Sequence, residues 1–123
     1  MKVGIFPVTA KLFPSFPDGS ADAIELELPV GTGATFSVIP QDLLMRAGIR
    51  RIEQREILTV DRKLLKRDPG YVGIEVAGKR VLSPVLFGEA EDFGVLGALT
   101  MEIAGLIVDP ERKELLPRPA LLL

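Results

Sequence analysis

Residues 28–40 read LPVGTGATFSVIP, and this stretch decides the fold. It begins with the last residue of a run, Ala23–Leu28, in which apolar and charged residues alternate with the period of a strand that has one buried face. Gly31 and Gly33 then break the strand, because glycine permits backbone angles and close approaches that a Cβ would block. Phe36–Ile39 has the composition of a return strand. We therefore expect a strand, a glycine turn and a second strand.

The flanking segments extend this pattern in both directions. Upstream, the apolar-rich segment Lys2–Phe13 is separated from Ala23–Val30 by Pro14–Ser20, where Pro, Asp and Gly cluster. Such a cluster between two apolar runs marks a hairpin connection. Downstream, Pro40–Gly48 begins with proline, carries leucine and alanine on one helical face and ends with glycine. The chain is thus predicted to open with a β-hairpin and to form a helix of two to three turns after the return strand.

The middle of the chain predicts a second, longer hairpin. Ile57–Val60 and Tyr71–Val76 favour strands, and the charged segment Asp61–Asp68 lies between them. The simplest interpretation is a hairpin over about residues 57–75 with an exposed tip. Val81–Phe87 is predicted to follow as a largely buried strand.

The C-terminal third repeats the alternation of short elements. Phe93–Gly97 is predicted to be a short apolar strand, and Ala98–Ala104 a short helix closed by Gly105. Leu106–Pro110 leads into a turn, after which Glu114–Leu116 returns as a final strand. Many short strands with two brief helices indicate an all-β, barrel-like fold.

Length and composition indicate one soluble globular domain over residues 1–123. Hydrophobic residues make up 47% of the 123 positions, and the formal net charge is −2. This balance argues against a disordered or nucleic-acid-binding protein. The N-terminal residues lack the layout of a signal peptide, and no apolar run reaches the roughly 18 residues that span a bilayer. We expect a cytoplasmic protein with neither a nucleic-acid nor a membrane partner.

The chain contains no Cys and no His, which limits its chemistry. Disulfides and thiolate metal sites are excluded, as are Ser-His and Cys-His nucleophile pairs and the common zinc ligand sets. Acid–base chemistry would have to use carboxylates, Lys, Tyr or water. No metal or organic cofactor is predicted.

Two segments together resemble the retroviral-like (retropepsin-type) aspartic peptidases. Leu28–Pro40 resembles the active-site segment of that family, in which apolar residues precede Asp-Thr-Gly-Ala and a strand then runs into a helix. Val95–Gly97, followed by a helix and Gly105–Pro110, resembles the family's apolar-apolar-Gly strand beside the active-site loop. With the long hairpin between them, the resemblance covers nearly the whole chain. It implies a retropepsin-like closed β-barrel with one or two short helices that forms a symmetric homodimer.

The resemblance also implies a mechanism and a set of site residues. In the family each subunit supplies one Asp, and the two carboxylates share a proton at the dimer axis and activate a water. Thr32 would bond to the partner's loop, and Gly33 would let backbone amides approach the carboxylates. The hairpin at about 57–75 would be a flap that closes over an extended peptide or unfolded protein. The candidate substrate-binding residues are Ala34, Asp61, Arg62, Lys63, Leu64 and Leu65.

The departure from the family lies at Gly31, which occupies the position of the catalytic Asp. Glycine carries no ionisable group, and in a homodimer both halves of the acid pair disappear. We therefore expect an aspartic endopeptidase subunit that is inactive as written. A natural pseudoenzyme and a deliberate substitution both remain open. The alternative functions are a non-catalytic peptide-binding or assembly module and a purely structural domain.

Several other residues admit a functional and a simpler interpretation. Gly31–Gly33 is no phosphate loop, because neither a third glycine nor a P-loop lysine follows at the required spacing. The acids that could replace the missing carboxylate are better interpreted as solvated turn residues: Asp61, Asp92 and Asp109. The basic residues that could bind an acidic peptide are better interpreted as a solvated hairpin tip with Asp61 and Asp68 as partners: Arg62, Lys63, Lys66 and Arg67. The apolar tail Leu115–Leu123 would either pair as a strand between subunits or stay disordered.

Overall fold

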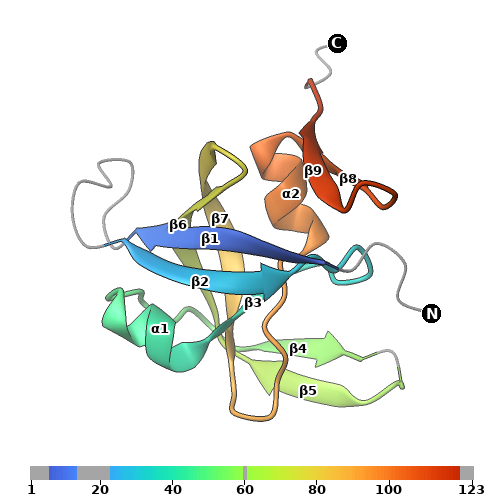
Figure 1. Ribbon diagram of the computed structural model, residues 1–123. Coiled ribbons are helices and arrows are strands. Elements are labelled where there is room, and N and C mark those ends of the chain that lie inside the picture. Colours follow the sequence, from blue (N-terminus) through green and yellow to red (C-terminus); the bar gives the residue numbers. More distant parts are fainter. Residues whose placement is uncertain (1–5, 14–22, 60, 120–123) are drawn as a thin grey trace.

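The fold is mostly β, with a curled half-barrel sheet and two short helices (Figure 1). The computed structural model describes residues 6–13, 23–59 and 61–119. The main sheet has five strands in the order β2-β1-β6-β7-β3, and β4–β5 and β8–β9 form two separate two-stranded sheets. The main-sheet strands are β1 (Pro7–Phe13), β2 (Ile24–Pro29), β3 (Ser37–Pro40), β6 (Pro69–Val76) and β7 (Lys79–Gly88). The remaining elements are α1 (Gln41–Arg46), β4 (Arg55–Leu58), β5 (Leu64–Arg67), α2 (Ala98–Ala104), β8 (Leu106–Asp109) and β9 (Glu114–Pro117).

The strand pairing confirms the predicted opening hairpin. β1 and β2 are antiparallel, with Pro7 opposite Pro29 and Leu12 opposite Ile24. The predicted connection at residues 14–20 lies outside the described residues. β3 pairs with β7 in parallel, so the chain crosses over after the glycine turn rather than folding back on β2.

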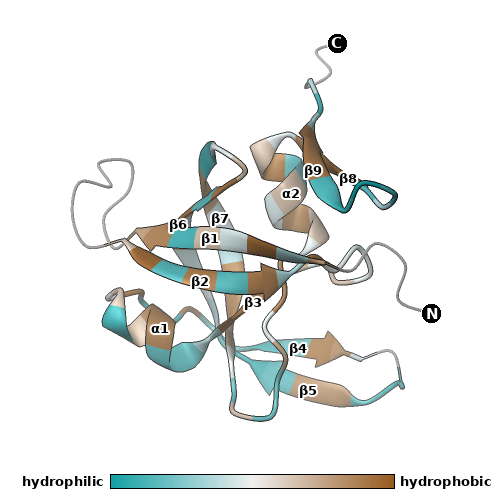
Figure 2. Ribbon diagram, in the orientation of Figure 1, coloured by the Kyte–Doolittle hydropathy of each residue, from teal (hydrophilic) through white to brown (hydrophobic). Residues whose placement is uncertain are grey.

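The core lies on one face of the main sheet, where α2 and β8 also contribute buried residues. Along β2, Leu28 is buried, Leu26 is half-buried, and the glutamates between the apolar residues are exposed, which is the alternation expected from the sequence (Figure 2). The inward-facing side chains of β6, Val72, Ile74 and Val76, are fully buried. Burying such side chains contributes about 1.5–3 kcal/mol each, so the sheet and the core stabilise one another.

Helix α1 is shorter than the sequence predicts. It spans Gln41–Arg46, fewer residues than the two to three turns expected. The reason lies at its start, where Pro40 is the last residue of β3 and has extended backbone angles instead of helical ones. Leu44 is buried beneath the sheet, as the apolar face of the predicted helix requires.

The predicted long hairpin is the largest error of the sequence analysis. β4 pairs with β5, with Leu58 opposite Leu64, so the return strand lies inside the segment that we expected to be an exposed tip. The hairpin therefore spans residues 55–67 rather than 57–75, and β6 belongs to the main sheet. The charges around Leu64 and Leu65 concealed a strand whose apolar residues pair across the hairpin.

The C-terminal third follows the prediction closely. Helix α2 covers Ala98–Ala104 and ends at Gly105, whose φ of +67° is left-handed and favours glycine. The expected strand at Phe93–Gly97 is reduced to two bridged residues, Val95 and Leu96. Of the apolar tail, Leu115 and Leu116 lie in β9, and residues 120–123 are outside the described part. Within the described ranges, no helix is long and apolar enough to cross a membrane.

Candidate functional site

The Gly31–Ala34 turn lies directly on the Val95–Gly97 segment. The Gly31 N–H donates to the Leu96 carbonyl at 2.9 Å, and the Leu96 N–H donates to the Pro29 carbonyl, also at 2.9 Å. Val30 and Leu96 form a parallel bridge at the same place. The two segments on which the family resemblance depends are therefore neighbours in the fold, although more than sixty residues separate them in the sequence.

Helix α2 holds the other side of the turn. Its first backbone N–H groups, on Ala98 and Leu99, donate to the carbonyls of Ala34 and Thr35 at 2.7 and 3.0 Å. In Figure 1 the turn between β2 and β3 accordingly lies between α2 and the β4–β5 hairpin. Both ends of the turn are thus held by backbone hydrogen bonds, to the bridged residue Leu96 at one end and to α2 at the other, and we call the turn with these contacts the platform.

A chain of buried hydroxyls lies beneath this platform. The Gly97 N–H donates to Ser37 Oγ at 2.9 Å, and Thr100 Oγ1 lies 2.6 Å from Ser37 Oγ and 2.8 Å from Ser83 Oγ. Ser83 Oγ then donates to the Pro84 carbonyl at 3.1 Å. One consistent direction of donation, from Gly97 through Ser37, Thr100 and Ser83, satisfies each hydroxyl in turn. The three side chains are fully buried, so they connect β3, β7 and α2 where water does not reach them.

The predicted catalytic residues come together in this turn, with different exposure. Thr32 and Gly33 are exposed, whereas Gly31 is half-buried. A Cβ built on Gly31 would fall closer than 3.0 Å to the Cγ2 methyl of Val95, whereas a Cβ on Gly33 would meet no atom within 4 Å. The space for a side chain is therefore open at position 33 and filled at position 31.

A cavity of about 510 Å³ separates the turn from the β4–β5 hairpin. Gly33, Ala34 and Phe36 contribute from the turn side, and Ile57 and Leu58 from the hairpin side. The predicted role of Ala34 in the cleft floor is compatible with this position. The lining is mainly apolar, so the cavity is suited to an apolar side chain.

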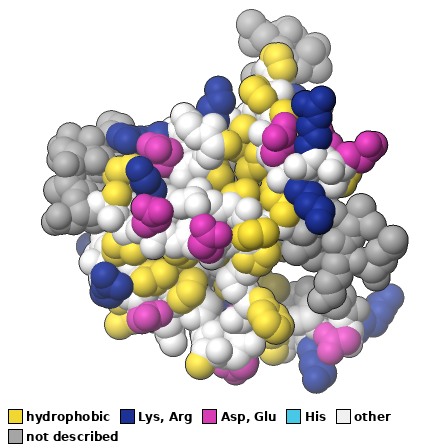
Figure 3. Space-filling view, viewed as in Figure 1, with side chains coloured by type: hydrophobic (Ala, Val, Ile, Leu, Met, Phe, Trp, Pro, Cys, Tyr) yellow, Lys and Arg dark blue, Asp and Glu magenta, His cyan; other side chains and the backbone are white. Residues whose placement is uncertain are grey.

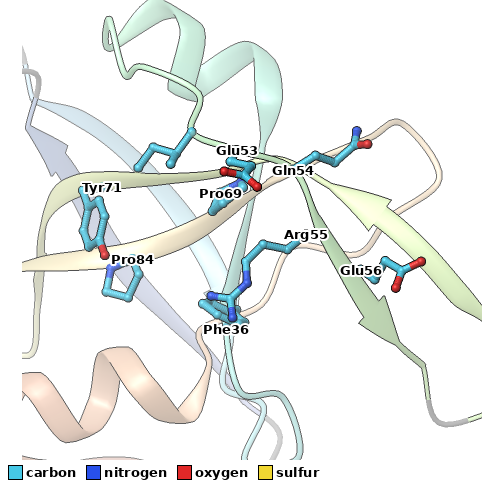
Figure 4. A pocket seen from close by; sticks show the side chains of 9 residues that line it. Phe36, Glu53, Gln54, Arg55, Glu56, Pro69, Tyr71 and Pro84 are labelled. Atoms are coloured by element: carbon cyan, nitrogen blue, oxygen red, sulfur yellow. The ribbon is translucent and has the colours of Figure 1, made fainter.

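A second cavity, of about 540 Å³, adjoins the first (Figure 4). Phe36 and Glu56 line both cavities. The Arg55 side chain extends towards Phe36, with its guanidinium carbon 5.4 Å from the ring centre, and Tyr71 lies beside Pro84. From the sequence, Phe36 and Tyr71 were each expected only to lie in a strand. The signal that could have identified Phe36 is a large aromatic residue three positions after Gly33.

The predicted binding residues of the hairpin tip lie away from these cavities. None of them lines either cavity, and they occupy the turn and the strand β5: Asp61, Arg62, Lys63, Leu64 and Leu65. Asp61 accepts a hydrogen bond from the Thr59 hydroxyl and lies 4.0 Å from the Lys63 amine, as expected of a solvated turn. The hairpin side of the cleft is formed instead by β4 and Thr59.

Arg67 and Asp92 form an ion pair that the sequence analysis interpreted wrongly as two solvated groups. Arg67 Nε and Nη2 donate to the two Asp92 oxygens at 2.6 and 2.8 Å, and the Glu89 N–H also donates to Asp92. These hydrogen bonds, Arg67 foremost, lower the pKa of Asp92, and the same pair raises the pKa of Arg67. The pair connects the end of β5 to the loop before Gly94. Sequence periodicity could not find it, because 25 residues separate the partners.

The remaining predicted charges have local structural roles. Asp68 pairs with Arg51 at 2.7 Å rather than with the hairpin cations. Asp109 accepts the backbone N–H groups of Glu111 and Arg112, which confirms it as the start of a turn. Across residues 6–13, 23–59 and 61–119, no group of three or more acidic side chains is placed to hold a metal ion.

Comparison of the chain with protein-family models finds no match, and comparison with curated proteins finds none either. The chemical interpretation of the site therefore depends on its geometry. The turn offers exposed backbone, the Thr32 hydroxyl and an apolar cavity under a hairpin. Position 31 carries no carboxylate, so the turn itself supplies no acid that could activate water.

Proposed function

We propose that this chain is one subunit of a homodimeric, retropepsin-like aspartic endopeptidase, with a closed β-barrel, whose cleft binds extended peptide and whose hydrolysis is disabled by Gly31. One observation carries the proposal: the Gly31–Ala34 turn is bonded to Leu96 and faces an apolar cavity beneath the β4–β5 hairpin. The substrate class is an unfolded protein or a peptide in extended conformation.

The shape of the cleft supports a peptide as the ligand. The two cavities share Phe36 and Glu56, so they are neighbours. Together they offer space for more than one ligand side chain. An extended peptide places alternate side chains on the same face, about 7 Å apart, and could insert them into successive cavities. The mainly apolar lining favours aliphatic or aromatic side chains nearest the turn.

The exposed apolar surface of the C-terminal elements supports a second copy as the partner. Ile103 on α2 is 46% exposed, and Ile107 on β8 is 41% exposed and pairs with Leu116 on β9. In Figure 3 apolar side chains are visible over the upper part of the molecule, where α2, β8 and β9 lie. Since α2 also bonds to the turn, a symmetric contact across this surface would bring two turns towards a shared groove.

The dimer is tested by sedimentation equilibrium, with a substitution inside this surface and another outside it. The chain is expected to sediment at twice the 13.4 kDa of one copy, and Ile107→Glu to yield monomers, because a carboxylate would be buried in an apolar contact. Met45→Glu is the control outside this surface, since Met45 is an exposed apolar residue of α1, which lies away from α2 (Figure 1). A wild-type chain that is monomeric at all concentrations, or an Ile107→Glu variant that still dimerises, contradicts the proposal.

The disabled chemistry is tested by restoring the acid. Gly31→Asp is combined with Val95→Ala, which removes the methyl that occupies the space of a new Cβ. The double variant is assayed on an unfolded protein at mildly acidic pH, with and without a transition-state inhibitor of aspartic peptidases. Cleavage by the double variant but not by the unsubstituted chain, abolished by the inhibitor, is expected. Peptide binding by the dimer without cleavage in any variant would favour the non-catalytic peptide-binding module instead.

A further inference from the structure

We propose that Val95 fills the space of the missing acid, so that the cleft floor of this chain is adapted to glycine at position 31 and cannot accept an acid there unless residue 95 is made smaller. Only the expected effect of this contact on peptide cleavage rests on the proposed function. The contact itself is a property of the fold.

Backbone conformation does not explain the glycine. Among the described glycines, those with positive φ are Gly48, Gly78 and Gly105, so Gly31 lies outside the left-handed region that disfavours an L-residue. What excludes a side chain is space, because a Cβ at position 31 would overlap the Val95 Cγ2 methyl. The Val95 Cβ itself would be 3.8 Å away, an ordinary contact. The obstacle is therefore one methyl group.

The backbone around this methyl has little freedom to move. Val95 and Val38 exchange backbone hydrogen bonds of 2.9 and 3.0 Å. The Gly31 N–H donates to the carbonyl of Leu96, the residue that follows Val95. A backbone shift large enough to relieve the overlap would lengthen these bonds beyond the usual range. The alternative is rotation about χ1 of Val95, and a β-branched side chain has few acceptable rotamers.

Two consequences follow for the site. The space beside position 31 holds the half-buried hydrocarbon side chain of Val95, where the family would hold a carboxylate. A single Gly31→Asp change also has to displace Val95, so the acid would be forced away from its productive position. Displacements of this size reduce catalysis strongly, since reacting groups must be held to within about 0.5 Å.

The contact is tested by a double-mutant cycle that does not require activity. Gly31→Ala adds only the Cβ and is expected to lower Tm by about 5 °C or more, as overpacking does in domains of this size. In the Val95→Ala background the same change is expected to lower Tm by less than half as much. Gly33→Ala is the matched control in the same turn and is expected to leave Tm unchanged, since its Cβ would be in open space. All variants are compared at one protein concentration, because association shifts Tm.

The catalytic consequence is tested by comparing Gly31→Asp with Gly31→Asp/Val95→Ala. At least tenfold faster cleavage by the double variant is expected. Additive Tm changes in the cycle would overturn the inference, and so would a single variant that cleaves as fast as the double one. Coupled Tm changes without cleavage in either variant would support the Val95 contact and count against the peptidase proposal, so the two failures can be distinguished.

Discussion

The two sides of the cleft, which we call the floor and the roof, are held in place by different kinds of contact. The floor, residues 31–37 with Val95–Thr100, is bonded through its backbone to two neighbouring segments and rests on a buried chain of hydroxyls. The roof, β4–β5, is a two-stranded sheet separate from the main sheet, and its base is held by the Arg67–Asp92 pair. Segments with few buried contacts open at lower free energy. The comparison indicates that the turn is held by more contacts than the β4–β5 hairpin, which we therefore expect to open at the lower free energy.

The largest expected difference between the two regions concerns apolar side chains. Leu96 in the floor is fully buried, and Leu96→Ala should reduce the free energy of unfolding by about 2–5 kcal/mol through lost burial and a residual cavity. Leu64 in the roof is 64% exposed, and Leu64→Ala should change the free energy of unfolding by less than about 0.5 kcal/mol. Urea unfolding of both variants measures the difference. Equal losses would mean that the roof is as integral to the core as the floor.

The hydroxyl chain should have the next largest effect. Thr100→Val keeps the volume but removes the hydroxyl between Ser37 and Ser83, which leaves the buried Ser37 O–H without an acceptor at a cost of about 1–3 kcal/mol. Thr100→Ser retains the hydroxyl and is the control for the lost oxygen. Unfolding free energies of the two variants are compared in urea. A Thr100→Val variant as stable as Thr100→Ser would show that the hydroxyl chain contributes little to the stability of the floor.

The Arg67–Asp92 pair should make the roof sensitive to acid. The pKa of Asp92 is lowered in the fold, so its stabilisation is complete above the unfolded-state pKa and is lost as pH falls through the lower, folded-state value. Asp92→Asn should cost about 1 kcal/mol at neutral pH, since the amide can still accept one bond from Arg67. It should also reduce the loss of stability on acidification. Asp61→Asn, at the exposed hairpin turn, is the control.

Hydrogen exchange at neutral pH locates the same effect. Asp92→Asn should accelerate exchange of the β4–β5 amides more than that of the Gly31 and Leu96 amides in the floor. Uniform acceleration in both regions would indicate that the pair stabilises the whole domain and is not specific to the roof.

The smallest effect is expected where the roof contacts the floor. Arg55 is exposed and lies over Phe36, a cation–π contact that contributes about 0.5–1 kcal/mol or less at such sites. Arg55→Ala should therefore change the unfolding free energy by no more than this amount, and Arg50→Ala, also exposed, serves as the control. Thermal denaturation at one protein concentration compares them. A larger loss would show that the contact holds the roof closed.

Sequence reasoning succeeded where the pattern is local. The alternation in β2, the glycine turn at 31–33 and the helix ended by Gly105 each depend on residues within a few positions of one another. The floor was predicted for this reason, together with the adjacency of its two segments that the family resemblance implied. The roof was predicted less well, because charged neighbours concealed the pairing of Leu58 with Leu64.

The sequence by itself determined that the chain is β-rich, where its turns lie, and that His- and Cys-based chemistry and an acid at position 31 are absent. Local backbone preference and residue chemistry are sufficient for these conclusions. Only the tertiary structure decided that Val95 fills the space beside Gly31, that three hydroxyls bond in a chain and that Arg67 pairs with Asp92. Each of these contacts joins residues far apart in the sequence. Which side chains fill a given space is decided only when the segments that carry them are packed together.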